Sequence, residues 1–567
     1  MKKSIVIVCL IALGALLRFA FLDRLPVSPN WDEVSHGYNA YSILKTGMDE
    51  WGKPFPLIFR AFGDYKLPLY IYLSTIPVAI FGLNIFAIRF ISALSGTLAI
   101  LGIFLLSKIL FPDKVFRVAK RQIKMEHLAA FLLAISPWHF FVSRPALEAN
   151  LSLTLIIFGF YYFIRFVKSQ SSLIPSVFLL GLSLHSYNTA RIFVPLMVVA
   201  SFIVFRRSIF SKQKFMSLFR NFKSVLAVLL ALLFSGLVLY QVYAGEGTAR
   251  YEKVKILSPA TVFQIGEQRA ASTLSPLLAK LIHNRPLYLV TTVTKNYLGY
   301  FSPQFFFQTW GAQFQFAIPN TNLLTVPVYL LMCLGFILCL PRLKTKENYR
   351  FLYLWLLLSP VAASLTIDPP QALRPNPMIP ALIIFASLGV ARLLKIIPEK
   401  IKTLSLILIT LWILMSLGQY LIQYQGSYAK KYSSSWQYGY RQVISFIVDH
   451  QSEYDRVFIT KRYGEPHIFY TFYTRMSPNM LQPGPDNIRF EQSDWFWTDK
   501  IDNVYFVNDW QIPSTPISTL TLESGSTISA QRSLLVTSPD HLPVNAHVIE
   551  TINFLDDTPA FIITSIP

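Results

Sequence analysis

The chain has 567 residues, of which 53% are hydrophobic and only 14% are charged. In a typical soluble domain about a quarter of the residues are charged, so this composition excludes an ordinary soluble protein and predicts a membrane protein. The net charge of +21 comes from 51 Lys and Arg against 30 Asp and Glu. Because the basic residues gather in short loops between apolar runs, the positive-inside rule explains this charge, and we expect no nucleic acid partner.

Eleven apolar runs are long enough to cross a bilayer, which takes about 20 residues of helix. The first, residues 5–22, follows two lysines, and no small-x-small cleavage site comes after it. We therefore interpret it as an uncleaved span with a cytoplasmic N-terminus. The other ten runs are residues 87–111, 127–143, 149–167, 172–190, 192–207, 224–243, 321–341, 350–366, 377–397 and 403–424.

Four loops rich in Lys and Arg set the predicted orientation. They are residues 112–126, 206–223, 342–350 and 395–402, and their charge predicts that they face the cytoplasm. The loops at residues 23–86 and 244–320 then face the other side. We expect a multi-pass protein of the plasma (inner) membrane and the cell envelope.

One apolar segment does not fit this orientation. Leu67–Phe86 is apolar enough to span, but a crossing there would move all four basic loops to the outer side. Pro68 and Pro77 also interrupt it, and a proline inside a helix costs about 3 kcal/mol. We expect one or two juxtamembrane helices that lie along the outer face.

The composition changes after Leu421. Residues 426–567 contain short apolar runs at 456–460, 503–507 and 560–564, and a helical pattern from Tyr440 to His450 precedes them. The predicted fold class is therefore an all-α polytopic membrane domain, residues 1–425, with about 11 transmembrane helices plus juxtamembrane helices. A small extracytoplasmic α/β domain, residues 426–567, follows it.

The first outer loop, residues 23–86, carries two adjacent carboxylates, Asp32 and Glu33. An acidic pair in a loop is most often solvated and has no catalytic role. Here the aromatic flanks Trp31 and Tyr38 place the loop near the membrane interface, where partial desolvation raises a carboxyl pKa and favours a general base. Lys66, where the loop returns to the membrane, is either a snorkelling interfacial lysine or a cation for a lipid phosphate.

Three further charged residues lie at the outer ends of predicted spans. Glu148 follows Arg144 by four residues, a spacing that suits either a helical ion pair or a functional acid. Arg374 either anchors the next span or contacts a phosphate. No ATP-binding P-loop and no Rossmann, zinc-protease or α/β-hydrolase motif occurs in a suitable context, which argues against an ATP-driven pump and a Rossmann-type nucleotide-sugar enzyme.

With these residues the chain resembles the GT-C membrane glycosyltransferases, and most closely the bacterial relatives of the protein O-mannosyltransferases and of the lipid A aminoarabinose transferase. The likeness covers the order of elements over roughly residues 1–425. The motifs that carry it are Trp31-Asp32-Glu33 with Tyr38, Ala40 and Gly47, then Tyr65-Lys66-Leu67-Pro68, and Ala146-Leu147-Glu148. Asn296–Pro303 and Ala372–Arg374 look like motifs of uncharacterised bacterial members.

The resemblance implies that Asp32 is the catalytic base, with Glu33 beside it. It implies that Glu148 is a second acid, although the family usually has aspartate there, and that Lys66 contacts the lipid phosphate. Tyr38, Arg144 and Arg374 complete the predicted substrate-binding residues.

The implied reaction transfers a hexosyl or pentosyl group, with inversion, from a polyprenyl-phosphate donor to a hydroxyl of a protein, lipid or glycan acceptor at the outer face. Because phosphate is already a good leaving group, no cofactor is required. Some relatives bind a divalent metal ion near the acids, and we leave that possibility open.

The main alternative is a transporter or flippase of a lipid-linked saccharide. Transporters place ionisable groups near the bilayer midplane on broken helices. Here the acids lie in outer loops or at helix ends, which favours chemistry at the surface. A receptor anchored only to display residues 426–567 would not need eleven spans.

Overall fold

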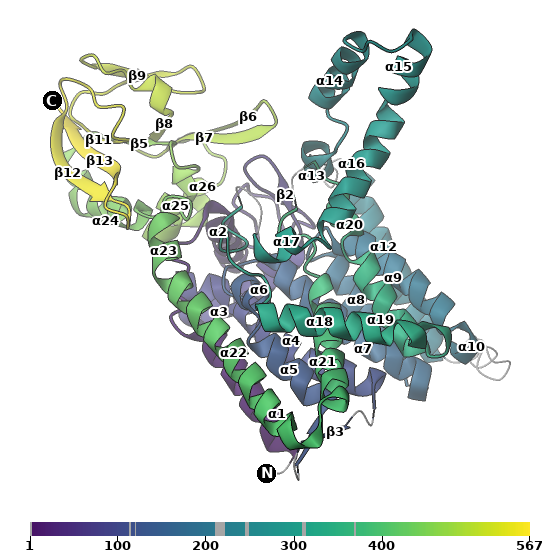
Figure 1. The fold of residues 1–567 in the computed structure, drawn as a ribbon. Coiled ribbons are helices and arrows are strands. Elements are labelled where there is room, and N and C mark those ends of the chain that lie inside the picture. Colours follow the sequence, from purple (N-terminus) through teal and green to yellow (C-terminus); the bar gives the residue numbers. More distant parts are fainter. Residues whose placement is uncertain are drawn as a thin grey trace. The chain divides into compact units, whose positions relative to one another are not determined.

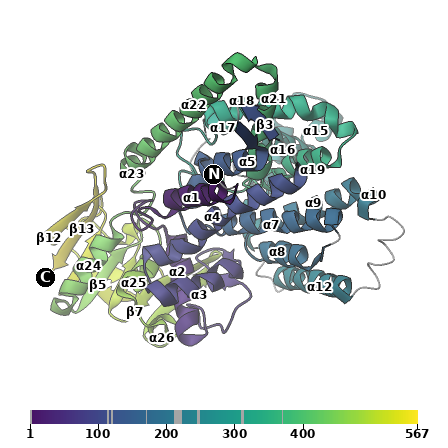
Figure 2. The same ribbon diagram turned by 90° about the horizontal axis from the view of Figure 1, so that it is seen from below.

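The computed structural model describes residues 3–112, 115–118, 121–169, 171–209, 222–243, 249–308, 313–367 and 370–567. Two compact units divide the chain, and each is assembled from separate stretches (Figures 1 and 2). Unit 1 consists of Met1–Arg18, Leu94–Ser143 and Glu148–Tyr420, and unit 2 of Phe19–Ala93, Arg144–Leu147 and Leu421–Pro567. Most of the predicted basic loop at 206–223 and part of the outer loop at 244–320 lie outside the described residues.

Apolar helices form most of unit 1, and three of its helices continue into unit 2. The helices of the first half are α1 (Lys3–Phe19), α4 (Ile85–Leu110), α5 (Met125–Ala134), α6 (Pro137–Val142), α7 (Glu148–Ser169), α8 (Ile174–Leu184), α9 (Ala190–Val204), α10 (Arg206–Ile209) and α12 (Phe222–Tyr243). Those of the second half are α13 (Ala249–Val254), α14 (Pro259–Ala270), α15 (Pro276–Ile282), α16 (Arg285–Gly299), α17 (Pro303–Phe307), α18 (Val326–Cys339), α19 (Glu347–Leu358), α20 (Val361–Ser364), α21 (Met378–Ile396) and α22 (Glu399–Gln425). A short hairpin of β3 (Val115–Val118) and β4 (Arg121–Lys124) lies between α4 and α5.

Every one of the eleven predicted runs contains a helix, and the chain is a multi-pass membrane protein. In the described residues, six helices are long and apolar enough to cross a bilayer, namely those that begin at Ile85, Glu148, Phe222, Val326, Met378 and Glu399. The other runs hold shorter helices, so the number of eleven spans stays a prediction. The run at 127–143 is divided because Pro137 starts a new helix, α6, where α5 has ended.

Two glycines bring α18 and α21 into close contact. A Cβ atom at Gly335 would overlap the backbone of α21, and one at Gly389 would overlap the backbone of α18. Such small residues let two membrane helices pack backbone against backbone. The contact fixes α21, whose N-terminus follows the loop that carries Arg374.

A seven-stranded mixed sheet forms the centre of unit 2, with the strand order β12-β13-β11-β5-β8-β7-β6. Its strands are β5 (Arg456–Thr460), β6 (Asn487–Gln492), β7 (Trp495–Ile501), β8 (Val504–Val507), β11 (Ser533–Thr537), β12 (His547–Asn553) and β13 (Pro559–Ile566). Strand β5 is parallel to β11 and to β8, and the other pairs are antiparallel. The hairpin of β9 (Thr519–Thr521) and β10 (Thr527–Ser529) and the helices α23 (Ser427–Lys431), α24 (Tyr440–His450), α25 (Pro466–Thr474) and α26 (Pro478–Leu481) complete this part of the chain. The prediction of an α/β fold here is confirmed.

The predicted first outer loop, residues 23–86, belongs to the same unit as this sheet. It contains α2 (Trp31–Thr46), the two-stranded hairpin of β1 (Phe59–Arg60) and β2 (Tyr65–Lys66), and α3 (Pro68–Phe81). Helix α2 packs against α3, α25 and α26, as Figure 2 shows. One hydrophobic core holds Val34 and Tyr38 of α2 together with Val457 and Ile459 of the sheet. A domain boundary at residue 425 would therefore separate α2 from the sheet, although the two share one hydrophobic core.

Candidate active site

Asp32 and Glu33 lie in the first turn of α2, a helix that the hydropathy pattern does not predict. The side chain of Asn30 accepts a hydrogen bond from the backbone N–H of Glu33 at 2.9 Å, and the Glu33 carboxylate accepts one from the backbone N–H of Asn30 at 3.3 Å. This reciprocal capping box starts the helix. It also turns the two neighbouring acids in different directions, since Glu33 is 1% exposed and Asp32 is 52% exposed.

Glu33 is held by a fully buried arginine. Arg89 donates to it from Nε at 2.8 Å and from Nη2 at 3.0 Å, and the backbone N–H of Ala146 donates to it at 2.7 Å. The remaining N–H groups of Arg89 reach the carbonyl oxygens of Leu22, Pro26 and Ser28. All five guanidinium donors are thus used. This network joins the start of α4, the start of α2 and the segment before it.

We expect Glu33→Gln to destabilise the protein more than it affects the chemistry. Breaking a buried ion pair from one side typically costs about 3–5 kcal/mol, because the other charge stays buried without compensation. The thermal melting temperature of the protein in detergent measures the loss. Glu399→Gln is the control, because Glu399 pairs with Lys402 at the surface, where an ion pair contributes about 1 kcal/mol or less. Equal melting shifts for the two variants would contradict a structural role for Glu33.

Asp32 faces Lys66. The Lys66 ammonium donates to Asp32 Oδ1 at 2.5 Å and to the Asp32 carbonyl oxygen at 3.3 Å. The hairpin sets this geometry, because β1 pairs with β2 and places Lys66 opposite Phe59, a residue of the core. The Lys66 side chain is 11% exposed, whereas half of the Asp32 side chain is open to solvent. A lysine ammonium and an accessible carboxylate therefore lie side by side.

His36 lies one helical turn after Asp32 and was not singled out by the sequence. It is 2% exposed, and its ring lies 5.2 Å from that of Tyr70. Burial, followed by the charge of Lys66, lowers the pKa of His36 to about 3, against a smaller opposing effect of Asp32. The imidazole is therefore neutral near pH 7. The i,i+4 spacing from Asp32 is the signal that would have identified it.

Two predicted substrate-binding residues have mainly structural contacts in unit 2. Tyr38 is fully buried in the core, and its hydroxyl donates to the carbonyl oxygen of Met476 at 3.1 Å. Arg144 donates to the carbonyl oxygens of Ala20, Phe21 and Leu25, the nearest at 2.8 Å. For Tyr38 this geometry favours packing over substrate contact. For Arg144 it supports the turn that leads out of α1.

The C-terminal part of the chain holds Trp31, the residue before Asp32. The Gln437 side-chain oxygen accepts from the backbone N–H of Trp31 at 2.7 Å, and its amide nitrogen donates to the carbonyl oxygen of Tyr463. Gly464, with a φ of +112°, leaves room for the Trp31 ring, because a Cβ there would overlap the ring. We call Gln437 and Gly464 the Trp31 clamp. It connects the sheet domain to the turn that carries Asp32.

The other predicted residues lie in unit 1. Glu148 is the first residue of α7, and Arg144 precedes that helix. Asn376 donates to the carbonyl oxygen of Ala149 at 2.9 Å, which joins the start of α7 to the loop of Arg374.

Arg374 itself is 8% exposed and donates to Thr366 Oγ1 at 2.6 Å. The side chain of Asn296 donates to the carbonyl oxygen of the same Thr366 at 3.1 Å. Residues from the predicted motifs around 148, 296 and 374 are therefore linked by hydrogen bonds within unit 1.

Within the described residues, no group of three or more His, Cys, Asp or Glu side chains is placed to hold a metal ion. Both carboxylate oxygens of Glu33 already accept hydrogen bonds from Arg89 and from backbone groups. The acidic pair at 32 and 33 therefore does not form a ready-made bidentate site. The metal dependence considered from the sequence stays open.

Comparison with solved structures identifies the fold. The crystal structure of ArnT from Cupriavidus metallidurans bound to undecaprenyl phosphate matches with a TM-score of 0.53 and 13% identity, over 100% of this chain and 98% of that chain. The apo form of the same protein gives a TM-score of 0.52 with the same identity and coverage. The chain has the fold of the GT-C membrane glycosyltransferases.

Further comparisons give one family model and a weaker structural likeness. Residues 66–240 match the family model of the dolichyl-phosphate-mannose-protein mannosyltransferases. The oligosaccharyltransferase AglB from Archaeoglobus fulgidus, in complex with an inhibitory peptide and a dolichol-phosphate, aligns at 14% identity over 84% of this chain and 64% of that chain, with a TM-score of 0.49. No curated protein sequence matches the chain.

Proposed function

We propose that this protein is an inverting glycosyltransferase that moves a sugar from a polyprenyl-phosphate carrier to an acceptor hydroxyl at the outer face of the membrane. The observation that carries the proposal is the contact of Lys66 with Asp32, an ammonium and an accessible carboxylate on a GT-C fold. The match of residues 66–240 to a family named for a dolichyl-phosphate donor, and the likeness to a protein solved with undecaprenyl phosphate, support a lipid-phosphate donor.

The difference between the two ion pairs supports separate roles for Asp32 and Glu33. The Glu33–Arg89 pair is buried on both sides and is costly to break, whereas solvent reaches the Asp32 side of the Asp32–Lys66 pair and weakens it. An arriving donor phosphate can therefore compete for the Lys66 ammonium at little cost. Its arrival leaves the Asp32 carboxylate without that cation, and so available to an acceptor.

In the proposed reaction the acceptor oxygen attacks the anomeric carbon while Asp32 takes the proton of the hydroxyl. The bond between the anomeric carbon and the phosphate oxygen breaks, and its electron pair leaves with the polyprenyl phosphate. Lys66 stabilises the negative charge that develops on this leaving group. Attack opposite the departing phosphate inverts the configuration at the anomeric carbon.

We assign Glu148 to the same reaction as a second acid. The backbone of Ala146 contacts Glu33 directly, and Glu148 follows it by two residues. Arg374 and Arg144 are proposed to support the donor phosphate or the loops around it.

Lys66→Ala is expected to raise the donor KM by about 10- to 100-fold, because one charge-assisted hydrogen bond to phosphate contributes about 1.5–3 kcal/mol. Lys66→Arg should recover part of this loss, since a guanidinium also binds phosphate. Initial rates measured at several donor concentrations give the KM. The donor for this assay carries the sugar that is absent from the surface glycans of a deletion strain. A donor KM unchanged in Lys66→Ala would count against the phosphate contact.

The proposed orientation places residues 23–86 and 426–567 outside the cytoplasm. A cysteine introduced at position 430, in α23, is expected to react with a membrane-impermeant maleimide added to intact cells or spheroplasts. A cysteine at position 120, in the basic loop after α4, is expected to react only after the membrane is opened. Labelling of position 120 from outside would refute the orientation.

The overall test uses a strain from which the gene has been deleted. Mass spectrometry of its surface glycans should show the loss of one sugar from a protein, lipid or polymer, and the wild-type gene should restore it. An unchanged surface glycan profile, together with the accumulation of a lipid-linked saccharide on the cytoplasmic side, would instead favour a flippase.

A further inference from the structure

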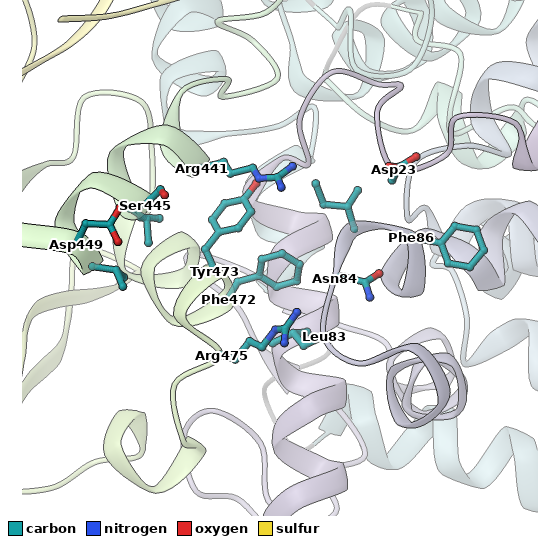
Figure 3. A pocket seen from close by; sticks show the side chains of 13 residues that line it. Asp23, Leu83, Asn84, Phe86, Arg441, Ser445, Asp449, Phe472, Tyr473 and Arg475 are labelled. Carbon is teal, nitrogen blue, oxygen red and sulfur yellow. The ribbon is translucent and has the colours of Figure 1, made fainter. Parts of the chain in front are cut away.

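Unit 2 contains a hollow of about 730 Å³ that the proposed reaction does not use (Figure 3). It is lined by Asp23, by Leu83–Phe86 at the start of α4 and just before it, by Arg441, Ile444, Ser445, Val448 and Asp449 of α24, and by Phe472, Tyr473 and Arg475 of α25 and its end. Neither Asp32 nor Lys66 contributes to the lining. Its volume lies within the range of about 300–1,000 Å³ that is typical of pockets for small ligands.

The sequence of α24 explains one wall of the hollow. Its lining residues follow the spacing i, i+3, i+4, i+7 and i+8 and so form one stripe along the helix. The opposite stripe, with Tyr440, Val443 and Ile447, is buried in the core of unit 2. The facing wall contributes apolar and aromatic side chains, including Leu83 and Phe86. The hollow therefore has polar and charged side chains on its α24 wall and apolar side chains on the facing wall.

Two arginines in the hollow have unused hydrogen-bonding capacity. Among the described residues, neither Arg441 nor Arg475 forms an ion pair or a side-chain hydrogen bond. The hydroxyl of Tyr473 points toward the Arg441 guanidinium in Figure 3. Burial raises the pKa of Tyr473 to about 12, so this hydroxyl remains a donor near pH 7.

The two acids of the hollow, Asp23 and Asp449, lie on different sides of it (Figure 3). Asp23 lies 3.8 Å from Arg24, which offsets its charge. Asp449 lies beside Ser445 on the side of the hollow away from Asp23 (Figure 3). The lining therefore offers strong donors on Arg441, Arg475 and Tyr473, and one separate acceptor on Asp449. A ligand with a phosphate and a hydroxyl or ammonium group matches this distribution.

The place of the hollow in the chain indicates where such a ligand comes from. Asp23 closely follows α1, and Leu83–Phe86 lead directly into α4, one of the apolar helices long enough to cross a bilayer. Residues just outside such helices lie at the level of the lipid headgroups. A smaller hollow of about 170 Å³ shares Asp23, Ile85, Arg441 and Tyr473 with the first and extends it to Ser28.

We propose that this hollow binds the headgroup of a membrane phospholipid, with the phosphate on Arg441, Arg475 and Tyr473 and the headgroup hydroxyl or ammonium toward Asp449. The acyl chains leave along the apolar residues that precede α4. The site is separate from the donor site, and this proposal does not depend on the glycosyltransferase assignment.

The test is native mass spectrometry of the full-length protein released from nanodiscs of defined composition. The wild-type protein is expected to retain phosphatidylethanolamine or phosphatidylglycerol but not diacylglycerol, which has no phosphate. Arg441→Ala and Arg475→Ala should each lower this retention by about tenfold or more, as expected for the loss of one charge-assisted hydrogen bond. Ser445→Trp, which fills the hollow without removing a charge, should lower it as well.

A control variant separates this site from other charges. Arg532→Ala removes a 75% exposed arginine that does not line the hollow, so it should retain phospholipid like the wild type. Equal retention by Arg441→Ala, Arg475→Ala and the wild type would overturn the proposal, as would retention of diacylglycerol. Binding of inorganic phosphate to the hollow without retention of any phospholipid would overturn the lipid assignment and indicate a soluble phosphate ligand.

Discussion

Asp32→Asn is expected to lower the rate of sugar transfer by about 10²- to 10⁴-fold, the usual contribution of a positioned general base. Asparagine keeps the size and hydrogen-bonding shape of aspartate but does not take a proton from the acceptor hydroxyl. Because the Asp32 side chain is half exposed and Glu33 provides the buried cap contacts, the melting temperature should change little. Restoration of the surface glycan in the deletion strain measures activity.

Asp455→Asn is the matched control for this substitution. Asp455 belongs to the same unit, its side chain is 51% exposed, and it pairs with Arg532 at 3.9 Å. It therefore reproduces the exposure and the ion pair of Asp32 away from the proposed site. Full glycan synthesis by Asp32→Asn would refute its role as the base, and equal losses in both variants would point to a general effect of removing a surface charge.

Gly464→Ala is expected to reduce transfer by about 100-fold through a displacement of Trp31. A methyl group at this position overlaps the indole ring and also approaches the Gln437 amide that holds the Trp31 backbone. The turn that carries Asp32 then moves, and a shift of about 1 Å in a catalytic group costs roughly 10²-fold in rate. The loss should fall on kcat more than on the donor KM, because Lys66 is held by a different hairpin.

Gly525→Ala separates this clash from backbone strain. Gly525 also has a positive φ, of +84°, but nothing lies within 4 Å of a Cβ added there. It should cost only the strain of an L-residue in this conformation, about 1–3 kcal/mol of stability, without loss of kcat. In a Trp31→Ala background Gly464→Ala should lower kcat much less than it does in the wild type, as a double-mutant cycle can show. Equal kcat values for both in the wild-type background would contradict positioning by the clamp.

Patterns of apolar residues predicted the helices and strands whose formation depends on residues close in sequence. Helix α24 has the predicted bounds, Tyr440 and His450, and strand β5 has those of the run at 456–460. Apolar periodicity is a property of the segment itself, so it can be read without knowing the partner. Helix α2 was missed because hydropathy describes residues 23–86 as a loop, although Asn30 and Glu33 have the spacing of a capping box.

Long-range pairing explains the rest of what the sequence did not reveal. Arg89 is an arginine near the start of a predicted span, and nothing near it in sequence indicates that its partner is Glu33 or that three carbonyl groups accept its other donors. Gln437 and Gly464 likewise carry no motif, because their effect depends on Trp31, more than 400 residues earlier. The positions of Asp32 and Lys66 were singled out, but their contact was not predictable from spacing.

The shared core of the first loop and the final sheet has a consequence for biosynthesis. The ribosome completes residues 31–46 several hundred residues before the strands that cover them, a delay of tens of seconds at about 5–20 residues per second. Throughout that interval Val34 and Tyr38 of the nascent segment lack the packing partners that the sheet supplies. A holding chaperone, or the membrane surface itself, must shield it, and a chain truncated before Leu421 should be degraded rather than accumulate as a partly active protein.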